Sequence, residues 1–328
     1  MTAELGNGTS RVLLIVRARQ AWRHGDRLYQ IFLVLAVIAV MALVVGIGYE
    51  LWQNSALSRH AFGWKFLVTS DWDPALNDIF GALPFIYGTL LTSAIALLAA
   101  IPLGIGTAIF LAELAPDWLS QPLSFLAELL AAVPSVVYGL WGLFVYIPIF
   151  VRPTSQFLNK TMGFLPLFVG PVFGPSRLAA GLLLAIMVFP TITAVSRDVL
   201  RAIPDSQREA ALALGATRWE MIAQVLIPYG TSGLLGAVIL GLGRALGETI
   251  AVTMVIGNNL DLSASLLHPG YTMASVIANE FTEATFDLYL NALIEVGLIL
   301  FVITLLINLA ARLLIWRVSR RTKVEARA

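Results

Sequence analysis

Six long apolar runs limit what this chain can fold into more than any other feature of its sequence. They cover residues 28–48, 85–111, 123–151, 177–195, 229–256 and 290–316. Each run approaches or exceeds the roughly 20 residues that a helix needs to cross the hydrocarbon core of a bilayer. Backbone groups in lipid must satisfy their own hydrogen bonds, and the alternating pattern of a β-barrel is absent. The runs therefore predict an all-α membrane protein with six transmembrane helices.

Composition supports this class and excludes several others. Hydrophobic residues make up 58% of the chain and charged residues only 12%, whereas soluble domains are about 25% charged. The chain has no cysteine, and its three histidines, His24, His60 and His268, lie outside the apolar runs. We therefore expect no disulfide and no metal site within the membrane. A formal net charge of +1 gives no reason to expect a nucleic-acid partner.

The distribution of lysine and arginine predicts the orientation. Fifteen of these residues lie on the side that holds both termini and the loop 196–228, five lie on the opposite side, and Arg244 lies within a run. By the positive-inside rule, both termini are expected in the cytoplasm. We predict a cytoplasmic tail at 1–27, a transmembrane domain at 28–318 with its core at 82–318, and a second tail at 319–328. The first run is expected to remain as an uncleaved anchor.

The cytoplasmic loop 196–228 carries strong local signals for two short helices. Residues 206–209 and 217–220 both have the Ser/Thr-x-x-Glu pattern of a capping box, in which each end of the motif satisfies a backbone N–H of the other. Gly215 lies between them and suits a left-handed helix end. The second helix is expected to end before Pro228. The alternative is an ordinary loop helix that packs only on its own membrane domain.

Arg244 and Glu248 are two charged residues inside the fifth run. A charge at the centre of a membrane helix costs about 2.5–3.5 kcal/mol, so both must face protein, each other or water. Their spacing of four predicts that they share a helix face. We expect Arg244 to offer its planar fork to two oxygens of an oxyanion in a translocation path. Glu248 would pair with Arg244 in the empty path and accept a hydrogen bond from a protonated oxygen. An internal salt bridge without further function is the alternative.

Other embedded polar residues permit two explanations each. Ser135 and Tyr138 follow Pro134, which predicts a bend in the third run, and they either line the path or pack against the bent helix. Glu128 and Glu295 lie near the ends of runs, so we expect both to extend to the membrane interface.

Two sets of residues resemble known permeases. The first consists of Glu209, Ala210, Ala211, Gly215, Val225, Ile227 and Pro228. It resembles the EAA motif of permeases of ABC importers, which reads E-A-A, three residues, G, nine residues, I-x-L-P. Val225 and Ile227 replace the Ile and the Leu of that pattern. The second set consists of residues 81–89, 132–142 and 243–249, and resembles the C-type permease subunits of ABC phosphate importers from about residue 64 to the sixth run.

This resemblance implies a fold and a function. The fold would be that of a type I ABC importer permease, and the chain would translocate inorganic phosphate across the bacterial cytoplasmic membrane. The loop 196–228, here called the coupling loop, would dock on an ATPase through Glu209, Ala210, Ala211 and Gly215. The implied partners are a homologous A-type permease subunit, two ATPase subunits, an extracytoplasmic phosphate-binding protein and membrane lipid.

The chain itself lacks the parts needed for ATP hydrolysis. No phosphate-binding loop of the G-x-x-x-x-G-K-[ST] type occurs, and no Gly-Lys pair is found anywhere. We therefore expect no cofactor in this chain and no enzymatic activity of its own, with ATP and Mg²⁺ bound by the partner ATPase.

Three alternatives remain at the level of sequence. An ABC permease for sulfate, molybdate or another solute would share most of these features, although a carboxylate one turn from Arg244 disfavours fully ionised sulfate. A passive channel would not need a loop that docks an ATPase. An intramembrane enzyme is disfavoured because the chain has neither H-E-x-x-H nor G-x-S-x-G and no histidine in a run.

Overall fold

The structure is a computed structural model that describes residues 5–75 and 77–325, with side chains for residues 29–75 and 77–317. Contacts divide the chain into two units, Met1–Gln53 and Asn54–Ala328. The described part of the first unit belongs to the long helix α1 (Leu5–Asn54), whose last residue lies in the second unit. Its apolar part, Tyr29–Asn54, has none of its most hydrophobic window buried inside the protein. Such a helix suits a lipid environment or the surface of another subunit.

Six helical segments of the described residues are long and apolar enough to cross a membrane, which confirms the predicted fold class. They are Tyr29–Asn54, Leu83–Leu114, Ser135–Met162, Arg177–Arg201, Arg218–Gly247 and Asp287–Arg317. The orientation of the termini and the domain limits at 1–27 and 319–328 stay predictions, because those tails lie outside the residues whose side chains are described.

The third predicted run differs most from the expectation. Instead of one bent helix, the chain forms α5 (Asp117–Ala132), an extended break, and then α6 (Ser135–Trp141). At Pro134 the backbone is extended, with φ −58° and ψ 139°. A proline has no N–H to donate and disfavours helix in the residue before it, so it ends α5 rather than bending it. The span continues through π-helix η2 (Gly142–Val151) and α7 (Arg152–Met162).

The fifth run is interrupted after Gly247, which was not predicted, but it is continuous before that residue. Helix α10 (Arg218–Met221) continues through π-helix η4 (Ile222–Leu226) into α11 (Ile227–Gly247). The expectation that the second loop helix ends before Pro228 was therefore wrong, because Pro228 occupies the first turn of α11, where proline is tolerated. The true interruption follows Gly247, and the short helix α12 (Ile250–Ile256) begins after it.

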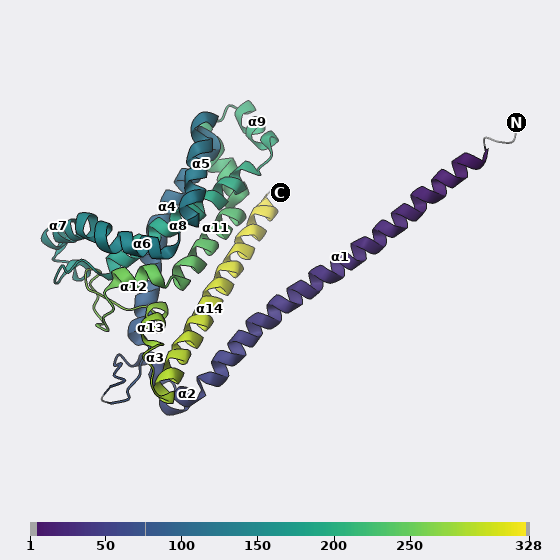
Figure 1. Cartoon of the computed structure of the whole chain (residues 1–328). Helices are drawn as coiled ribbons and strands as arrows, with labels where there is room; N and C mark the ends of the chain where they lie inside the picture. The colour runs from purple at the N-terminus through teal and green to yellow at the C-terminus, as the bar shows by residue number, and fades with distance from the viewer. Residues whose placement is uncertain (1–4, 76, 326–328) are drawn as a thin grey trace. The chain divides into compact units, whose positions relative to one another are not determined.

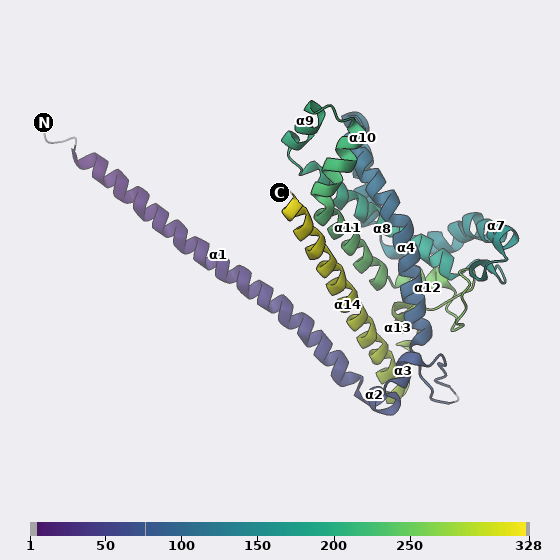
Figure 2. The same cartoon turned by 180° about the vertical axis from the view of Figure 1, so that it is seen from behind.

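Within the second unit, the best-buried span is α8 (Arg177–Arg201), which packs on α4 (Leu83–Ile109) and α11. Helix α4 continues as π-helix η1 (Phe110–Leu114), and the last span belongs to α14 (Asp287–Glu325). Figures 1 and 2 place α9 (Asp205–Ala213) toward the end of this unit where α14 finishes. The short helices α2 (Ala56–Phe62), α3 (Lys65–Val68) and α13 (Met273–Glu280) lie toward the opposite end.

Three apolar clusters hold the second unit together. The middle cluster includes Leu183, Met187 and Val255, and an inner cluster near α9 includes Leu200 and Leu226. The outer cluster is rich in aromatic residues that meet edge to face or stack, an arrangement worth more than area burial alone. Its aromatic members are Phe66, Trp72, Phe80, Phe85, Tyr271 and Tyr289. This cluster packs Phe66, Trp72 and Phe80 of the loop that follows α1. The helical turn η3 (Pro166–Phe168) lies in the irregular stretch 164–175.

The expectation that Glu295 extends to the membrane interface was wrong. Its side chain does not extend to the interface: the residue is only 6% exposed. It accepts a hydrogen bond of 2.5 Å from the Ser58 hydroxyl, and Asn291 on the same helix accepts one from the backbone N–H of Leu57. These bonds fasten α2 to α14. A buried carboxylate needs such a donor because burial without one is costly.

Candidate functional site

Two interrupted spans of the second unit meet at the candidate path. Helix α6 follows the break at Pro134, and α12 follows the break at Glu248. The two short helices touch closely, because a Cβ on Gly139 would lie 3.2 Å from Ala251 Cα and 2.5 Å from Met254 Sδ. Interrupted helices leave backbone groups free at membrane depth, which is how many transporters build a site for a polar substrate.

Arg244, near the end of α11, reaches this junction. Its Nη1 and Nη2 atoms lie 3.4 and 3.5 Å from the carbonyl oxygen of Ala131, in the last turn of α5. Nη1 also lies 3.3 Å from the hydroxyl oxygen of Thr191 on α8. All three bonds are longer than the 2.7–2.9 Å of a charge-assisted pair. The ion pairs found among the described side chains do not include Arg244, so its charge is not neutralised by a carboxylate.

Glu248 is not the partner that the sequence suggested. Because α11 ends at Gly247 and Glu248 is extended (φ −70°, ψ 125°), the two charged residues do not share a helix face. The Glu248 carboxylate instead accepts a hydrogen bond of 3.4 Å from the backbone N–H of Ala251 in the first turn of α12. A carboxylate at this position favours the start of a helix. The pairing of Arg244 with Glu248 in the empty path was therefore wrong.

The structure places the two other predicted path residues at the same break. Tyr138 is buried and donates a hydrogen bond of 2.9 Å to the carbonyl oxygen of Leu130. Ser135 is the half-buried first residue of α6. Arg244 and Tyr138 thus both donate to carbonyl groups in the last turn of α5, where the Leu130 carbonyl also accepts a bond of 3.4 Å from the backbone N–H of Val133. Sequence reasoning missed Thr191, because a threonine within an apolar run carries no distinctive signal.

A second arginine near this region is fully neutralised. Arg197 on α8 is buried, with Nη2 at 3.0 Å from Glu128 Oε1 and 2.8 Å from Asp198 Oδ1. Glu128 has an exposed side chain as expected, but it also pairs across to α8. Since two carboxylates already satisfy Arg197, Arg244 is the better candidate to meet an anion.

The coupling loop contains one of the two predicted capping boxes. The Thr217 hydroxyl oxygen accepts a hydrogen bond of 3.3 Å from the backbone N–H of Glu220. The Glu220 carboxylate accepts one of 2.8 Å from the backbone N–H of Thr217. The first predicted box was wrong: α9 begins at Asp205 after Pro204, and no side chain caps it. Ser206 therefore lies inside the first turn, two positions past the N-cap Pro204. Gly215 has φ +86°, as a left-handed helix end requires.

The EAA residues themselves lie on both sides of α9. Glu209 and Ala210 are exposed, whereas Ala211 is buried in the inner cluster. Two large apolar residues nearby face outward, Leu214 with 90% and Trp219 with 68% of its surface exposed. The loop therefore packs on its own membrane domain through one side and leaves an apolar side uncovered, a feature typical of an interaction surface.

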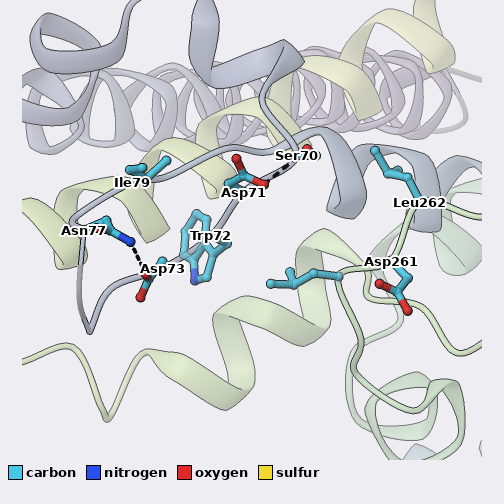
Figure 3. A pocket seen from close by; sticks show the side chains of 9 residues that line it. Ser70, Asp71, Trp72, Asp73, Asn77, Ile79, Asp261 and Leu262 are labelled. Carbon is cyan, nitrogen blue, oxygen red and sulfur yellow. Dashed lines mark hydrogen bonds between the residues drawn. The ribbon is translucent and has the colours of Figure 1, made fainter.

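A separate cavity of about 500 Å³ lies between the segment 70–79 and the segment 260–262 (Figure 3). Its lining includes Asp71, Asp73 and Asp261, and Asp73 accepts a hydrogen bond of 2.8 Å from Asn77. Carboxylates repel an anion, so this cavity does not suit an oxyanion. Among the described residues, no group of three or more His, Cys, Asp or Glu side chains is placed to hold a metal ion.

Sequence comparison relates the chain to a family of transport proteins. Residues 100–324 match the model of the family described as "Binding-protein-dependent transport system inner membrane component". A "Phosphate transport system permease protein PstC" of Mesorhizobium japonicum is 48% identical over 292 residues, or 88% of this chain and 89% of that protein. The protein of the same name from Pasteurella multocida is 45% identical over 92% of each chain.

Similar solved structures support the fold. A chain of a bacterial alginate ABC transporter in complex with an alginate-bound periplasmic protein aligns with a TM-score of 0.56 at 16% identity, covering 88% of this chain and 95% of that one. A chain of the inward-facing MetNI methionine ABC transporter aligns with a TM-score of 0.53 at 17% identity, covering 71% and 93%. At these identities the likeness concerns the fold alone. The match over two thirds of its length and the identity to the PstC permeases show that this chain belongs to the family of binding-protein-dependent transport system inner membrane components.

Proposed function

We propose that this chain is the permease subunit of an ATP-driven importer that carries inorganic phosphate across the bacterial cytoplasmic membrane. The observation that carries the proposal is 48% identity to a phosphate transport system permease over 88% of the chain. Arg244 lies beside two helix breaks, and no carboxylate among the described side chains forms an ion pair with it, which supplies a chemical reason for an anionic substrate.

The chemistry of Arg244 suits a tetrahedral oxyanion. Its two terminal nitrogens now share a single carbonyl oxygen of Ala131 at 3.4 and 3.5 Å. An oxyanion would offer each nitrogen its own charged acceptor, and such paired bonds are about twice as strong as bonds to neutral groups. Phosphate entering the path therefore displaces the carbonyl. The last turn of α5 is released in the same step.

Glu248 gives the path a preference among oxyanions. Phosphate still carries protons at neutral pH, whereas sulfate carries none. A carboxylate accepts a hydrogen bond from a protonated oxygen and repels an oxygen that bears only negative charge. Ser135 and Tyr138, at the break beside Arg244, complete the polar lining in this proposal.

Membership of the family makes this chain the membrane component of a transport system that depends on a binding protein. We propose that it pairs with a homologous A-type permease, that an extracytoplasmic phosphate-binding protein delivers the substrate, and that two ATPase subunits bind ATP and Mg²⁺. The coupling loop docks on an ATPase through Glu209, Ala210 and Gly215, with Ala211 buried against the membrane domain. Both termini are cytoplasmic in this arrangement.

Reconstitution tests the proposal. The complete complex in proteoliposomes, with binding protein outside and ATP inside, is expected to accumulate radiolabelled phosphate. Unlabelled sulfate or molybdate in about tenfold excess is expected to reduce the uptake less than twofold. Competition by either anion as strong as that by unlabelled phosphate would instead favour the other oxyanion. Uptake without ATP would favour a passive channel.

A further inference from the structure

A largely shielded ion pair fastens the coupling loop to the end of the second span. Arg208 of α9 places its Nη2 atom 2.7 Å from Glu113 Oε1 and its Nε atom 3.1 Å from Glu113 Oε2. This is the parallel two-bond geometry that makes arginine pairs directional. Glu113 lies in η1, which ends the span Leu83–Leu114. Both side chains are shielded from solvent, with 17% of Arg208 and 6% of Glu113 exposed.

The same guanidinium also holds the end of the fourth span. Its Nη2 atom donates to the carbonyl oxygen of Leu200 at 2.8 Å, and its Nη1 atom donates to that of Ile203 at 2.6 Å. Asp205 accepts a further bond of 3.2 Å but is 88% exposed. The hydrogen bonds to Glu113 raise the pKa of Arg208 above its ordinary value, so the guanidinium stays charged. One side chain of α9 thus contacts the ends of both α4–η1 and α8.

Stability alone is a poor reason for such a pair. Apolar residues of similar volume usually stabilise a buried position as well as an ion pair does, because both charges must first lose their water. The pair instead fixes a distance and a direction between α9 and two helices. The only EAA residue that α9 buries in the inner cluster is Ala211. Because its side chain is a single methyl group, this contact lets α9 slide over the membrane domain and does little to fix the direction of the helix.

The two helices that Arg208 holds lead to the candidate path. Helices α4 and α8 pack on one another. Farther along α8, Thr191 contacts the Arg244 side chain at 3.3 Å. A movement of α9 that Arg208 transmits to α8 therefore reaches the group proposed to bind the anion. Without this rigid link, α9 can move with the ATPase while the spans stay in place.

We propose that the Arg208–Glu113 pair is the positioning link that passes movement of α9 to α4 and α8, so that ATP hydrolysis by the partner opens the path. The inference rests on the proposed function. Arg208 acts here as a positioning residue, with neither phosphate nor ATP as its ligand. Its loss is expected to separate hydrolysis from transport without preventing the ATPase from docking.

The test uses the complete complex in proteoliposomes and measures ATP hydrolysed per phosphate imported. Arg208→Gln and Glu113→Gln are each expected to raise this ratio roughly fivefold or more, the lower end of typical coupling effects between sites, while the ATPase still co-purifies. Asp205→Asn is the matched control, since it removes only the exposed partner of Arg208, and it is expected to leave the ratio unchanged. An unchanged ratio in both glutamine variants overturns the inference.

Because the chain has no cysteine, a reversible cross-link can replace the pair. In Arg208→Cys with Glu113→Cys, a short bifunctional methanethiosulfonate reagent is expected to restore the wild-type ratio, and reduction is expected to remove the effect. If the variants lose the ATPase and cross-linking does not recover it, the pair serves only to fold the loop and the inference is wrong. Failure of the wild-type complex to import phosphate would instead contradict the proposed function.

Discussion

At the scale of single residues, the chemistry of the candidate path depends on a cation that is held weakly. The three bonds of Arg244 are 3.3–3.5 Å long and go to neutral oxygen atoms. Arg197, by contrast, has two carboxylates at 3.0 Å or closer. A substrate anion competes successfully for a guanidinium only where the existing partners are poor. The two arginines therefore have different roles although both lie within spans.

Arg244→Gln is expected to lower phosphate import by about a hundredfold or more, since hydrogen bonds to a charged group contribute about 1.5–3 kcal/mol each. Insertion and assembly should persist, because the bonds that Arg244 makes within the chain are long. Import of labelled phosphate is the measurement, and co-purification of the ATPase reports assembly. Arg244→Lys keeps the charge but loses the fork, so intermediate import is expected. Normal import by the glutamine variant would assign Arg244 a structural role.

Glu248→Gln separates the two roles of this carboxylate. The amide oxygen of glutamine still accepts the hydrogen bond from the Ala251 N–H, so the start of α12 should be preserved. The charge that accepts from a protonated phosphate oxygen is lost, and import is expected to fall about tenfold. Inhibition of import by sulfate should increase in the same variant. If neither phosphate import nor its inhibition by sulfate changes in this variant, Glu248 serves only to begin α12.

At the scale of elements, two interruptions decide what the spans can do. The breaks at Pro134 and after Gly247 turn two continuous apolar runs into pairs of helices whose ends meet. In a continuous α5–α6 helix the carbonyl of Ala131 would accept from the N–H of Ser135, whereas that of Leu130 would face Pro134, which has no N–H to donate. At the break these two carbonyls accept from Arg244 and Tyr138. At the other end of the spans, the left-handed turn at Gly215 lies between the exposed apolar residues Leu214 and Trp219 of the coupling loop.

Gly215→Asp is expected to abolish recruitment of the ATPase. The position has φ +86°, which costs most residues about 1 kcal/mol or more, and aspartate also adds a charge beside the exposed Leu214. The measurement is the amount of ATPase that co-purifies with the permease. Gly215→Asn is the control, because asparagine adopts this conformation more readily and is neutral, and it should retain most of the recruitment. Full recruitment by the aspartate variant would mean that this turn does not face the ATPase.

At the scale of the whole molecule, stability belongs to the second unit. Its three apolar clusters contain the fully buried Phe66, Leu183 and Leu226, whereas the apolar part of α1 is exposed within its own unit. In the outer cluster, Phe85 meets Trp72 at a centroid distance of 5.0 Å and an interplanar angle of 87°. The end of the second unit that contains α2 and α3 is thus held by aromatic packing and by the bonds between α2 and α14.

Phe85→Ala is expected to destabilise the isolated chain in detergent by about 3–5 kcal/mol, the usual cost of removing a buried phenylalanine. Phe85 is fully buried, whereas Phe32 on α1 is 68% exposed. Phe32→Ala should therefore cost less than about 1 kcal/mol under the same conditions. Thermal unfolding of both variants measures the difference. Equal losses would show that α1 contributes to the core of the isolated chain.

The sequence by itself determined the number of spans, the family and two local features of loop 196–228, its second capping box and its turn at Gly215. Long apolar runs can satisfy their backbone only as helices in lipid, so the six spans followed from composition along the chain. The second capping box and the turn at Gly215 were predictable because each depends on neighbours within four residues. Pro134 predicted an irregularity at the right residue, although its form was a break rather than a bend.

Only the tertiary structure decided which side chains meet. No proline marks the break after Gly247, so the sequence did not indicate that Glu248 and Arg244 lie on different elements. The contacts of Arg244 with Ala131 and Thr191 join residues more than fifty positions apart. Arg208 and Glu113 likewise come from distant elements. Local patterns encode helices and turns, but ion pairs and free charges depend on how helices pack, which short-range spacing does not specify.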